Sequence, residues 1–450
     1  MRKWGAKFSC NLMFIIVNVF LCLNLICAKG FEPLIQLPRF RSRNRLRFRR
    51  VVSVKDFGAK GDGLTDDSQA FTDAWTFACS LPYRPRLEVP AGRTYLVGPT
   101  DFSGPCRSSL TLRVSGNITA PKNPASWKGF SRRRWLYFYR LNRFTVEGGG
   151  TINGMGKEWW ARSCKINATY PCRHAPTAIT FRRCKNLKVQ HLIIVNSQQM
   201  HMAFSKSHWV MASYLQVIAP RESPNTDGIH ISASTHVVIK YSVIKTGDDC
   251  VSIVSNSSMI QVRNIYCGPG HGISIGSLGK SNSLDSVSHV LVDGAIISNT
   301  ENGLRIKTWQ GGHGFAKDIT FQSVQMENVS NPIIIDQYYC DSPLPCPNQT
   351  SAVQVVNVSY VGIKGTSATG EAIRFACSDT FPCKKIYLEN IHLRSYLGEL
   401  TRTFCWKARG SSYGSVCPPP CSSWNRNFIE QLVYSSTTNH LQVEEEPLPI

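Results

Sequence analysis

Short runs in which apolar and polar residues alternate fill the chain between about residues 105 and 400. They are rich in β-branched residues and are separated by turns of Gly, Asn and Ser. Alternation places every second side chain on the same face of a strand, which predicts an all-β structure. Sandwich, propeller and β-solenoid architectures all fit this description, and a fixed repeat would distinguish the solenoid.

Four tetrapeptides provide such a repeat. Each begins with a small residue and continues as apolar, polar, apolar, and the steps between them are 22, 22 and 31 residues. One turn of a parallel β-helix takes about this much chain, and a longer step means a longer loop on one side. We therefore predict a single-domain right-handed parallel β-helix. The four segments are residues 228–231, 250–253, 272–275 and 303–306.

A short helix is predicted at the N-terminal end of this domain, from about Ser68 to Ala78. Its apolar residues fall on one side, and residues 65–67 offer side chains that can cap it. Such a helix would cover the open end of the strand stack. The GDG turn before it resembles a calcium loop but lacks the full set of spaced oxygens, so we interpret it as a structural turn. The apolar positions are Ala70, Phe71, Ala74, Trp75 and Ala78.

The flanking segments differ in composition from the β-rich part. Residues 1–28 have a basic start and a short apolar stretch and are predicted to be a secretory signal peptide, with a retained signal anchor as the alternative. The sequence predicts a basic linker over residues 29–50, the parallel β-helix domain over residues 51–430 and a C-terminal tail over residues 431–450. Without a retained anchor we expect no stable association with a membrane.

The chain is strongly basic, with 51 Lys and Arg against 29 Asp and Glu and a formal charge of +22. Seven Arg lie between Arg39 and Arg50, in a segment whose role the sequence leaves open. A basic surface attracts nucleic acid, acidic lipid or acidic polysaccharide. Because the chain is predicted to be exported, we expect an acidic polysaccharide and no nucleic acid as partner, and we expect a monomer.

Cysteines and glycosylation sequons agree with export. Three of the 17 Cys lie in the predicted signal peptide, which leaves 14, an even number that suggests disulfides in an oxidising compartment. Close spacing suggests the pairs Cys164/Cys172, Cys250/Cys267, Cys340/Cys346 and Cys377/Cys383. Candidate N-glycosylation sites are Asn117, Asn167, Asn256, Asn328, Asn348 and Asn357.

The repeat brings possible catalytic groups together. Asp227, Asp249 and His271 each precede one of the aligned tetrapeptides, and Asp248 adds a third carboxylate. Parallel strands stack about 4.8 Å apart, so these side chains should form one column on one face. Repulsion among close carboxylates raises at least one pKa, so that one can hold a proton while another acts as a base. Hydrolysis of a glycosidic bond requires such a pair, and a nearby His can tune its protonation.

Two cationic residues, Arg305 and Lys307, follow on a later turn of the same face. They suit a substrate that carries carboxylates. They would also oppose a cation bound by the Asp and His residues, so we expect no metal and no cofactor. Each motif alone is an ordinary turn or strand sequence, and only their common order and register favour a catalytic site.

The ordered motifs NTDG, GDDC, GHG and RIK resemble those of the plant polygalacturonase family, which are pectin-hydrolysing glycoside hydrolases with a right-handed parallel β-helix. The stretches VKDFGAKGDGLTDDSQAF and NPIIIDQYYC also resemble this family, and the resemblance covers roughly residues 51–405. It implies a secreted enzyme of the cell wall that cleaves α-1,4-galacturonosyl linkages.

The resemblance also implies roles for individual residues. Asp248 would donate the proton, Asp227 and Asp249 would activate water, and His271 would maintain their ionisation. Arg305 and Lys307 would bind galacturonate carboxylates. Tyr339, rather than Tyr338, would lie near the substrate, and Asn225 would have a positioning role.

The resemblance implies inversion at the anomeric carbon. Carboxylates on neighbouring turns, about 5 Å apart, would instead favour retention by the general rule for glycosidases. Three alternatives stay open: a rhamnogalacturonan hydrolase, a calcium-dependent pectate lyase and a non-catalytic wall-binding protein.

Overall fold

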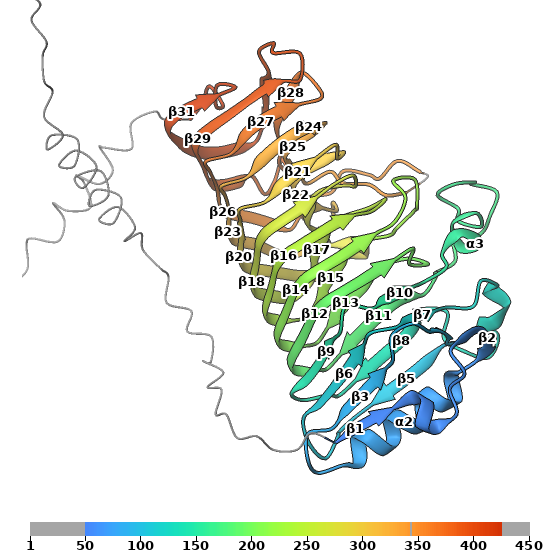
Figure 1. Cartoon of the computed structure of the whole chain (residues 1–450). Helices are drawn as coiled ribbons and strands as arrows, with labels where there is room; N and C mark the ends of the chain where they lie inside the picture. The colour runs from blue at the N-terminus through green and yellow to red at the C-terminus, as the bar shows by residue number, and fades with distance from the viewer. Residues whose placement is uncertain (1–49, 343, 425–450) are drawn as a thin grey trace, which may run out of the picture. The chain divides into compact units, whose positions relative to one another are not determined.

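The computed structural model describes residues 50–342 and 344–424. The predicted signal peptide, most of the basic linker and the C-terminal tail lie outside these residues. Within them the chain forms successive coils of a right-handed parallel β-helix (Figure 1), which confirms the predicted fold class. In the described part no helix is both long and apolar enough to cross a membrane.

One parallel sheet contains eleven strands, one from each coil (Figure 1). Its strands follow each other in sequence order along the stack. They are β5 (Thr100–Ser103), β8 (Arg134–Tyr139), β11 (Thr177–Arg182), β13 (Met202–Ser205), β15 (Ile229–Ser232), β17 (Val251–Val254), β19 (Ile273–Leu278), β22 (Asn302–Thr308), β25 (Asn331–Asp336), β28 (Glu371–Ala376) and β30 (Arg402–Trp406).

The remaining twenty strands pair into a second parallel network that covers the other sides of the coils. They are β1 (Val51–Ser53), β2 (Asp62–Asp66), β3 (Arg86–Val89), β4 (Thr94–Leu96), β6 (Leu110–Val114), β7 (Asn117–Thr119), β9 (Phe144–Glu147), β10 (Thr151–Asn153), β12 (Lys185–Val195), β14 (His208–Ile218), β16 (Thr235–Lys245), β18 (Ser257–Cys267), β20 (Leu284–Asp293), β21 (Ile296–Ser298), β23 (His313–Gln322), β24 (Gln325–Val329), β26 (Gln354–Val361), β27 (Lys364–Ser367), β29 (Cys383–Ser395) and β31 (Ala408–Cys417).

Four long strands, β12, β14, β16 and β18, each contain two residues in the left-handed region, and each bends at the second of them. The second residues are His191, Tyr214, Tyr241 and Asn264, with φ of 52°, 55°, 51° and 51°. A single left-handed residue turns an extended chain sharply, so each strand crosses from one side of the coil to the next. The second half of β18 accordingly pairs with β21, while its first half pairs with β20.

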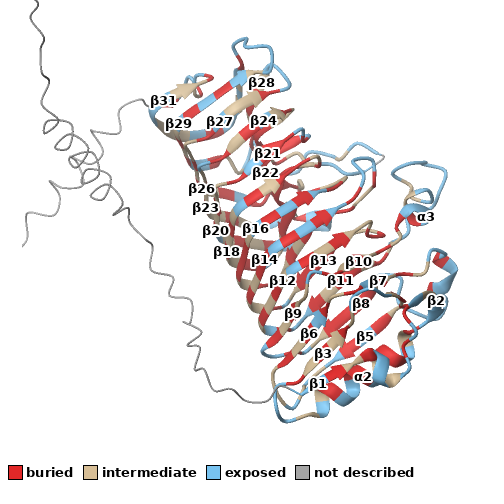
Figure 2. Ribbon diagram, viewed as in Figure 1, coloured by how far each residue is buried: buried red, intermediate tan, exposed pale blue. Residues whose placement is uncertain are grey.

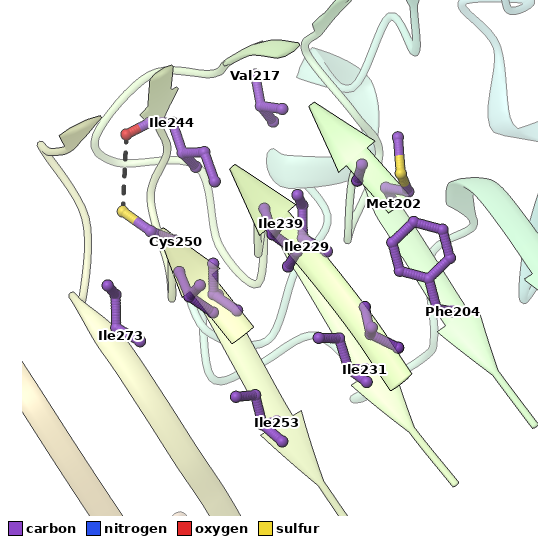
Figure 3. Packing of buried hydrophobic residues seen from close by; sticks show 14 of the residues in the cluster. Met202, Phe204, Val217, Ile229, Ile231, Ile239, Ile244, Cys250, Ile253 and Ile273 are labelled. Atoms are coloured by element: carbon purple, nitrogen blue, oxygen red, sulfur yellow. Dashed lines mark hydrogen bonds between the residues drawn. The ribbon is translucent and has the colours of Figure 1, made fainter. Parts of the chain in front are cut away.

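The core is a stack of apolar side chains inside the coils. Phe204, Ile231 and Ile253 occupy equivalent positions on three successive strands, and all three are fully buried (Figure 3). Buried and exposed positions alternate along the strands (Figure 2). This alternation leaves the outward positions available for polar chemistry.

Helix α2 (Ser68–Ser80) covers the N-terminal end of the core, as predicted. Its five predicted apolar residues are the ones that it buries. The ring of Trp75 lies 5.0 Å from Phe102 and 5.5 Å from Phe144. Asp67 occupies the N-cap position, but its carboxylate caps no helical N–H and instead accepts hydrogen bonds from the backbone N–H groups of Lys60 and Gly61.

The GDG turn is held by its own polar groups. The Asp62 side chain accepts hydrogen bonds from the backbone N–H groups of Leu64 and Thr65 and from the Thr65 hydroxyl, each at 2.8 Å. These hydrogen bonds lower the pKa of Asp62 to about 2. They support the interpretation of a structural turn. The other short helices are α3 (Lys157–Trp160) and the 3₁₀ helices η1 (Val54–Phe57), η2 (Pro124–Trp127) and η3 (Lys280–Asn282).

All four disulfides predicted from close spacing are present in the structure. They are Cys164–Cys172, Cys250–Cys267, Cys340–Cys346 and Cys377–Cys383.

Two further disulfides were not predicted. Cys79–Cys106 and Cys405–Cys421 join residues 27 and 16 positions apart. Cys184 and Cys417 are free, so two of the 14 cysteines beyond the signal peptide stay unpaired. The even number of cysteines therefore does not mean that every one of them is bonded.

The candidate glycosylation residues lie at accessible positions. Five of them are exposed and Asn328 is half-buried. Their glycosylation stays a prediction.

Candidate active site

The four aligned tetrapeptides pair in the register that the sequence predicts. Ile229 pairs with Val251, Val251 with Ile273, and Ile273 with Leu304. The turns that precede β15, β17 and β19 therefore lie at the same edge of the sheet. They carry Asp227, the Asp248–Asp249 pair and His271.

These side chains line one depression on the outer face of the eleven-stranded sheet, which we call the central groove. Its volume is about 530 Å³, within the range of ligand-binding pockets. The structure brings every predicted catalytic and substrate-binding residue to this groove. They are Asn225, Asp227, Asp248, Asp249, His271, Arg305, Lys307 and Tyr339.

Asp249 lies at the bottom of the groove and is held by three donors. Its Oδ1 accepts hydrogen bonds from Arg305 Nη2 at 2.6 Å and Ser274 Oγ at 2.7 Å, and its Oδ2 accepts one from Lys307 Nζ at 2.8 Å. Burial alone would raise the pKa of Asp249, but the charges of Lys307 and Arg305 outweigh burial and hold the pKa well below the usual range. Asp249 is therefore ionised.

Asp227 lies in a different electrostatic environment, although it is also buried. Its Oδ2 accepts a hydrogen bond from Ser252 Oγ at 2.7 Å, and no cation contacts it closely within the described residues. Burial first, and then the charges of Asp248 and Asp249, raise the pKa of Asp227 well above its usual value. The cluster therefore retains a proton at a pH where an isolated carboxylic acid is ionised, as the predicted crowding of carboxylates requires.

Asp248 is the most accessible of the three carboxylates, with a side-chain exposure of 16%. Its Oδ1 accepts hydrogen bonds from the backbone N–H of Asp249 at 2.8 Å and from His271 Nδ1 at 3.2 Å, and Asn225 Nδ2 donates to its Oδ2 at 3.3 Å. His271 Nε2 also lies 3.3 Å from Glu301 Oε2. Burial lowers the pKa of His271, but the hydrogen bond to Asp248 and the charges of Asp248 and Glu301 outweigh it and raise the pKa.

Arg305 and Lys307 lie on the outer face of β22, as predicted, but their main contact is with Asp249. Their side chains are only 9% and 8% exposed. Arg305 uses Nε to bind Ser274 at 3.0 Å and Nη2 to bind Asp249. Among the described residues Arg305 Nη1 has no hydrogen-bond acceptor, so this nitrogen can still bind a ligand that enters the groove.

The same contacts bear on metal binding. One ligand atom each of Asp248, Asp249 and His271 lies within 4.8 Å of the others. Both oxygens of Asp249, however, already bind cationic groups. The donor set therefore fits a metal ion poorly, because a cation would compete with Lys307 and Arg305.

Tyr339, rather than Tyr338, faces the central groove. Lys307 Nζ lies 5.4 Å from the centre of the Tyr339 ring. The Tyr338 hydroxyl instead donates a hydrogen bond to Asp379, outside the groove. The preference for Tyr339 at sequence level therefore agrees with its position.

The disulfide that follows Tyr339 is not part of the groove lining. Cys346 is half-buried and is bonded to Cys340, and neither cysteine is among the residues that line the central groove. The bond closes a short loop directly after Tyr339, with 5.9 Å between the two Cα atoms. Cys346 therefore closes a loop beside the site, as its predicted pairing with Cys340 implies.

Sequence reasoning missed four residues that hold the acidic cluster. Ser252 and Ser274 bind Asp227 and Asp249, His230 Nδ1 contacts Ser252 Oγ at 2.8 Å, and Glu301 contacts His271. Burial lowers the pKa of His230 to about 4, so this histidine is neutral. The aligned tetrapeptides already contained a signal, because His230, Ser252 and Ser274 occupy the same outward position as Arg305.

Comparisons with known proteins agree with this geometry. Residues 79–410 match the family described as glycosyl hydrolases family 28. A probable polygalacturonase of Arabidopsis thaliana is 56% identical over 414 residues, which cover 92% of this chain and 93% of the relative. A polygalacturonase of Persea americana is 52% identical, with 84% and 81% covered.

Two solved structures show the same fold. The endo-xylogalacturonan hydrolase from Aspergillus tubingensis superposes with a TM-score of 0.70 at 24% identity, which covers 83% of this chain and 100% of that one. The polygalacturonase from Erwinia carotovora gives 0.64 at 22% identity, with 79% and 96% covered. The family match spans most of the β-helix, and the chain therefore belongs to glycosyl hydrolases family 28.

Proposed function

We propose that the protein is a polygalacturonase that hydrolyses α-1,4-galacturonosyl linkages in polygalacturonate and pectin. The observation that carries this proposal is the acidic cluster itself. A deeply buried carboxylate fixed by Arg305 and Lys307 lies beside two other carboxyls, one of which has a raised pKa. Such a set supplies the acid and the base of glycoside hydrolysis, and relatives more than 50% identical carry the name polygalacturonase.

Asp248 is the proton donor in this proposal, because it is the carboxyl most open to the groove. Asp248 protonates the oxygen of the leaving sugar as the bond from that oxygen to the anomeric carbon breaks. His271, held between Asp248 and Glu301, keeps the local charge balanced.

Water is the nucleophile that this environment favours. Both oxygens of Asp249 are engaged by donors, which makes Asp249 a poor nucleophile toward carbon and a weak base. It can still accept the proton of the attacking water, because that proton becomes strongly acidic as the water oxygen bonds to the anomeric carbon. The water oxygen bonds to the anomeric carbon, its proton passes to Asp249, and Asp227 helps to orient it. A single displacement by water inverts the anomeric configuration, although the close carboxylates would favour retention by the general rule.

Substrate carboxylates would be bound by the exposed edges of Arg305 and Lys307. The guanidinium is planar and can serve two acceptors, so Arg305 can keep Asp249 and add a ligand at Nη1. Tyr339 would form one wall of this subsite. We further propose secretion to the cell wall, where the acidic polysaccharide is present, and action without a cofactor.

The test is the release of reducing ends from polygalacturonate by the purified protein, with and without a chelator. We expect activity that a chelator leaves unchanged and products without the ultraviolet absorbance of unsaturated uronides. A chelator-sensitive, absorbing product would instead indicate a lyase. Asp248→Asn should lower kcat by about 10²- to 10⁴-fold while substrate binding persists; full turnover in this variant would refute its role.

The stereochemistry needs a separate measurement. Proton NMR of the first products from a reduced-end oligomer reports the anomer that forms before mutarotation. We expect the β-anomer, because inversion of an α-linkage gives β. Initial α-product would overturn the single displacement and would make one of the carboxylates the nucleophile.

A further inference from the structure

Two loops from distant coils meet at the central groove. Lys165 lies in the connection between β10 and β11, and Asp341 lies in the connection between β25 and β26. Lys165 Nζ and Asp341 Oδ1 form an ion pair, although 176 positions separate the two residues in the sequence. Both residues line the central groove together with the acidic cluster. The ion pair therefore belongs to the groove, and it connects loops from different coils.

The ion pair spans the strands that carry the acidic cluster. In the eleven-stranded sheet, β11 and β25 are separated by β13, β15, β17, β19 and β22. At about 4.8 Å per strand spacing, these six spacings correspond to roughly 29 Å along the stack. Asp227, the Asp248–Asp249 pair and His271 precede β15, β17 and β19, in the middle of this distance. The two loops therefore reach toward each other from either side of the acidic cluster.

The loops also start from opposite edges of the sheet. Lys165 precedes β11, whereas Asp341 follows β25, and parallel strands all begin at one edge and end at the other. Burial first, and then the charges of Arg133 and Lys280, lower the pKa of His174, which lies in the same loop as Lys165. Lys280 follows β19 at the far edge. The loop of Lys165 therefore extends across the outer face of the sheet, and its ion pair with Asp341 spans the groove.

A disulfide lies directly beside each member of the pair. Cys164 precedes Lys165 and is bonded to a cysteine eight positions further along the chain. Cys340 precedes Asp341 and is bonded to a cysteine six positions further along. These bonds restrain the backbone at both ends of the ion pair, and preorganised loops lose less conformational entropy when they come together. The chain thus supports the contact between the two loops from both sides.

The ion pair itself is exposed and therefore opens readily. The side chains of Lys165 and Asp341 are 45% and 40% exposed. An exposed ion pair favours its closed arrangement by at most about fivefold, which corresponds to about 1 kcal/mol. A closed pair keeps a polymer from leaving the groove sideways, whereas an open pair lets it enter and leave. Loops that close over a substrate in this way commit it to reaction and still allow exchange.

We propose that Lys165 and Asp341 form a clasp that holds a polygalacturonate chain in the central groove between successive cleavages. This inference rests on the proposed function, and it adds a mode of action, in which one encounter leads to several cleavages of the same chain. The chain slides beneath the closed clasp and brings a new linkage to the acidic cluster. Because the ion pair carries no net charge, the clasp retains the chain by enclosing it and not by attracting it.

The test measures how fast fluorescently labelled octagalacturonate dissociates from proteins that carry Asp248→Asn, in which the oligomer stays intact. Adding Asp341→Asn to this background should speed dissociation about fivefold. By charge alone the same change would slow dissociation, because it removes a negative charge from a groove that binds a polyanion and frees Lys165. Faster dissociation is therefore a result that the clasp predicts and that simple electrostatic attraction does not.

Two further variants in the same background complete the test. The exchange Lys165→Asp/Asp341→Lys keeps the net charge and can form the pair again, so it should restore slow dissociation. Asp293→Asn is the matched control, because Asp293 forms a partly exposed ion pair with Arg263 on the second strand network. It should leave the dissociation rate unchanged. Slower or unchanged dissociation with Asp341→Asn, or no restoration by the exchange, would overturn the clasp.

Degradation of long polygalacturonate by the active enzyme gives a second measurement. Repeated attack releases several short products per encounter, so viscosity falls less for each reducing end that forms. Asp341→Asn should therefore lower viscosity more per reducing end than the parent and Asp293→Asn do, and an equal ratio in all three proteins would contradict repeated attack. Dissociation is measured without hydrolysis, so lack of hydrolysis by the parent counts against the proposed function alone.

Discussion

The contact between Lys307 and Asp249 gives a stability prediction that needs no substrate. The Nζ to Oδ2 distance is 2.8 Å and both side chains are almost fully buried. At an effective dielectric constant of about 20, two unit charges at this distance attract each other by about 6 kcal/mol. Lys307→Met removes this attraction but leaves Arg305 and Ser274 as partners of the carboxylate. We therefore expect a net loss of about 2–4 kcal/mol in the free energy of unfolding.

A double-mutant cycle tests whether this loss comes from the ion pair. Asp249→Asn alone leaves two buried cations without their counter-charge, so it should also destabilise the protein. The double variant Lys307→Met/Asp249→Asn leaves only the charge of Arg305 without a partner. Its loss of stability should therefore be smaller than the sum of the two single losses. The expected difference is about 1 kcal/mol or more, which is the coupling energy typical of residues in contact.

The assay is the midpoint of chemical or thermal unfolding, followed by circular dichroism. Lys364→Met is the matched control, because Lys364 is an exposed lysine on β27. It should change the free energy of unfolding by less than about 0.5 kcal/mol. Two results would refute the reasoning: a Lys307→Met protein as stable as the control, or single losses that simply add.

Three further predictions concern the residues around this pair. Glu301→Gln removes a charge that raises the pKa of His271, so the alkaline limb of the kcat/KM profile should move to lower pH; an unchanged limb would exclude this link. Asp227 has a raised pKa, so its stabilising protonated state is lost as pH rises through that pKa. Asp227→Asn should therefore become more stable than the parent above about pH 4 in pH-dependent unfolding, with the gap growing toward neutrality. Gly272 has φ of +82° and an added Cβ would lie 2.0 Å from a backbone oxygen, whereas Gly370 has free space. Gly272→Ala should lower the unfolding midpoint and kcat/KM together, while Gly370→Ala should change neither.

Much of the fold was predictable because each coil of the solenoid repeats the same short pattern of apolar and polar residues. The spacing of the aligned tetrapeptides predicted which residues pair across coils, and the pairing of Ile229, Val251, Ile273 and Leu304 confirms it. The disulfides of short spacing were predictable because their partners are close in the chain. Cys79–Cys106 was not, because it joins the capping helix to a later turn and depends on how the end of the stack is closed.

The chemistry of the site was predictable in outline only. Register alone indicated that Asp227, Asp248 and Asp249 would meet. Register could not indicate that Asp249 binds both Arg305 and Lys307 of β22. The partner of a side chain depends on its rotamer and on how deeply it is buried, as well as on the coil to which it belongs. Glu301 was missed because it occurs in no motif and approaches His271 from the next turn.

The unequal steps of the repeat show that insertions in the loops and insertions within the strands have different structural consequences. Steps of 22 and 31 residues place their strands in the same register, so extra residues in a connecting loop leave the paired positions unchanged. An insertion within a strand would instead exchange its inward and outward side chains at that level. Loop length can therefore vary at the rim of such an enzyme without changing its core, whereas the spacing within each strand cannot.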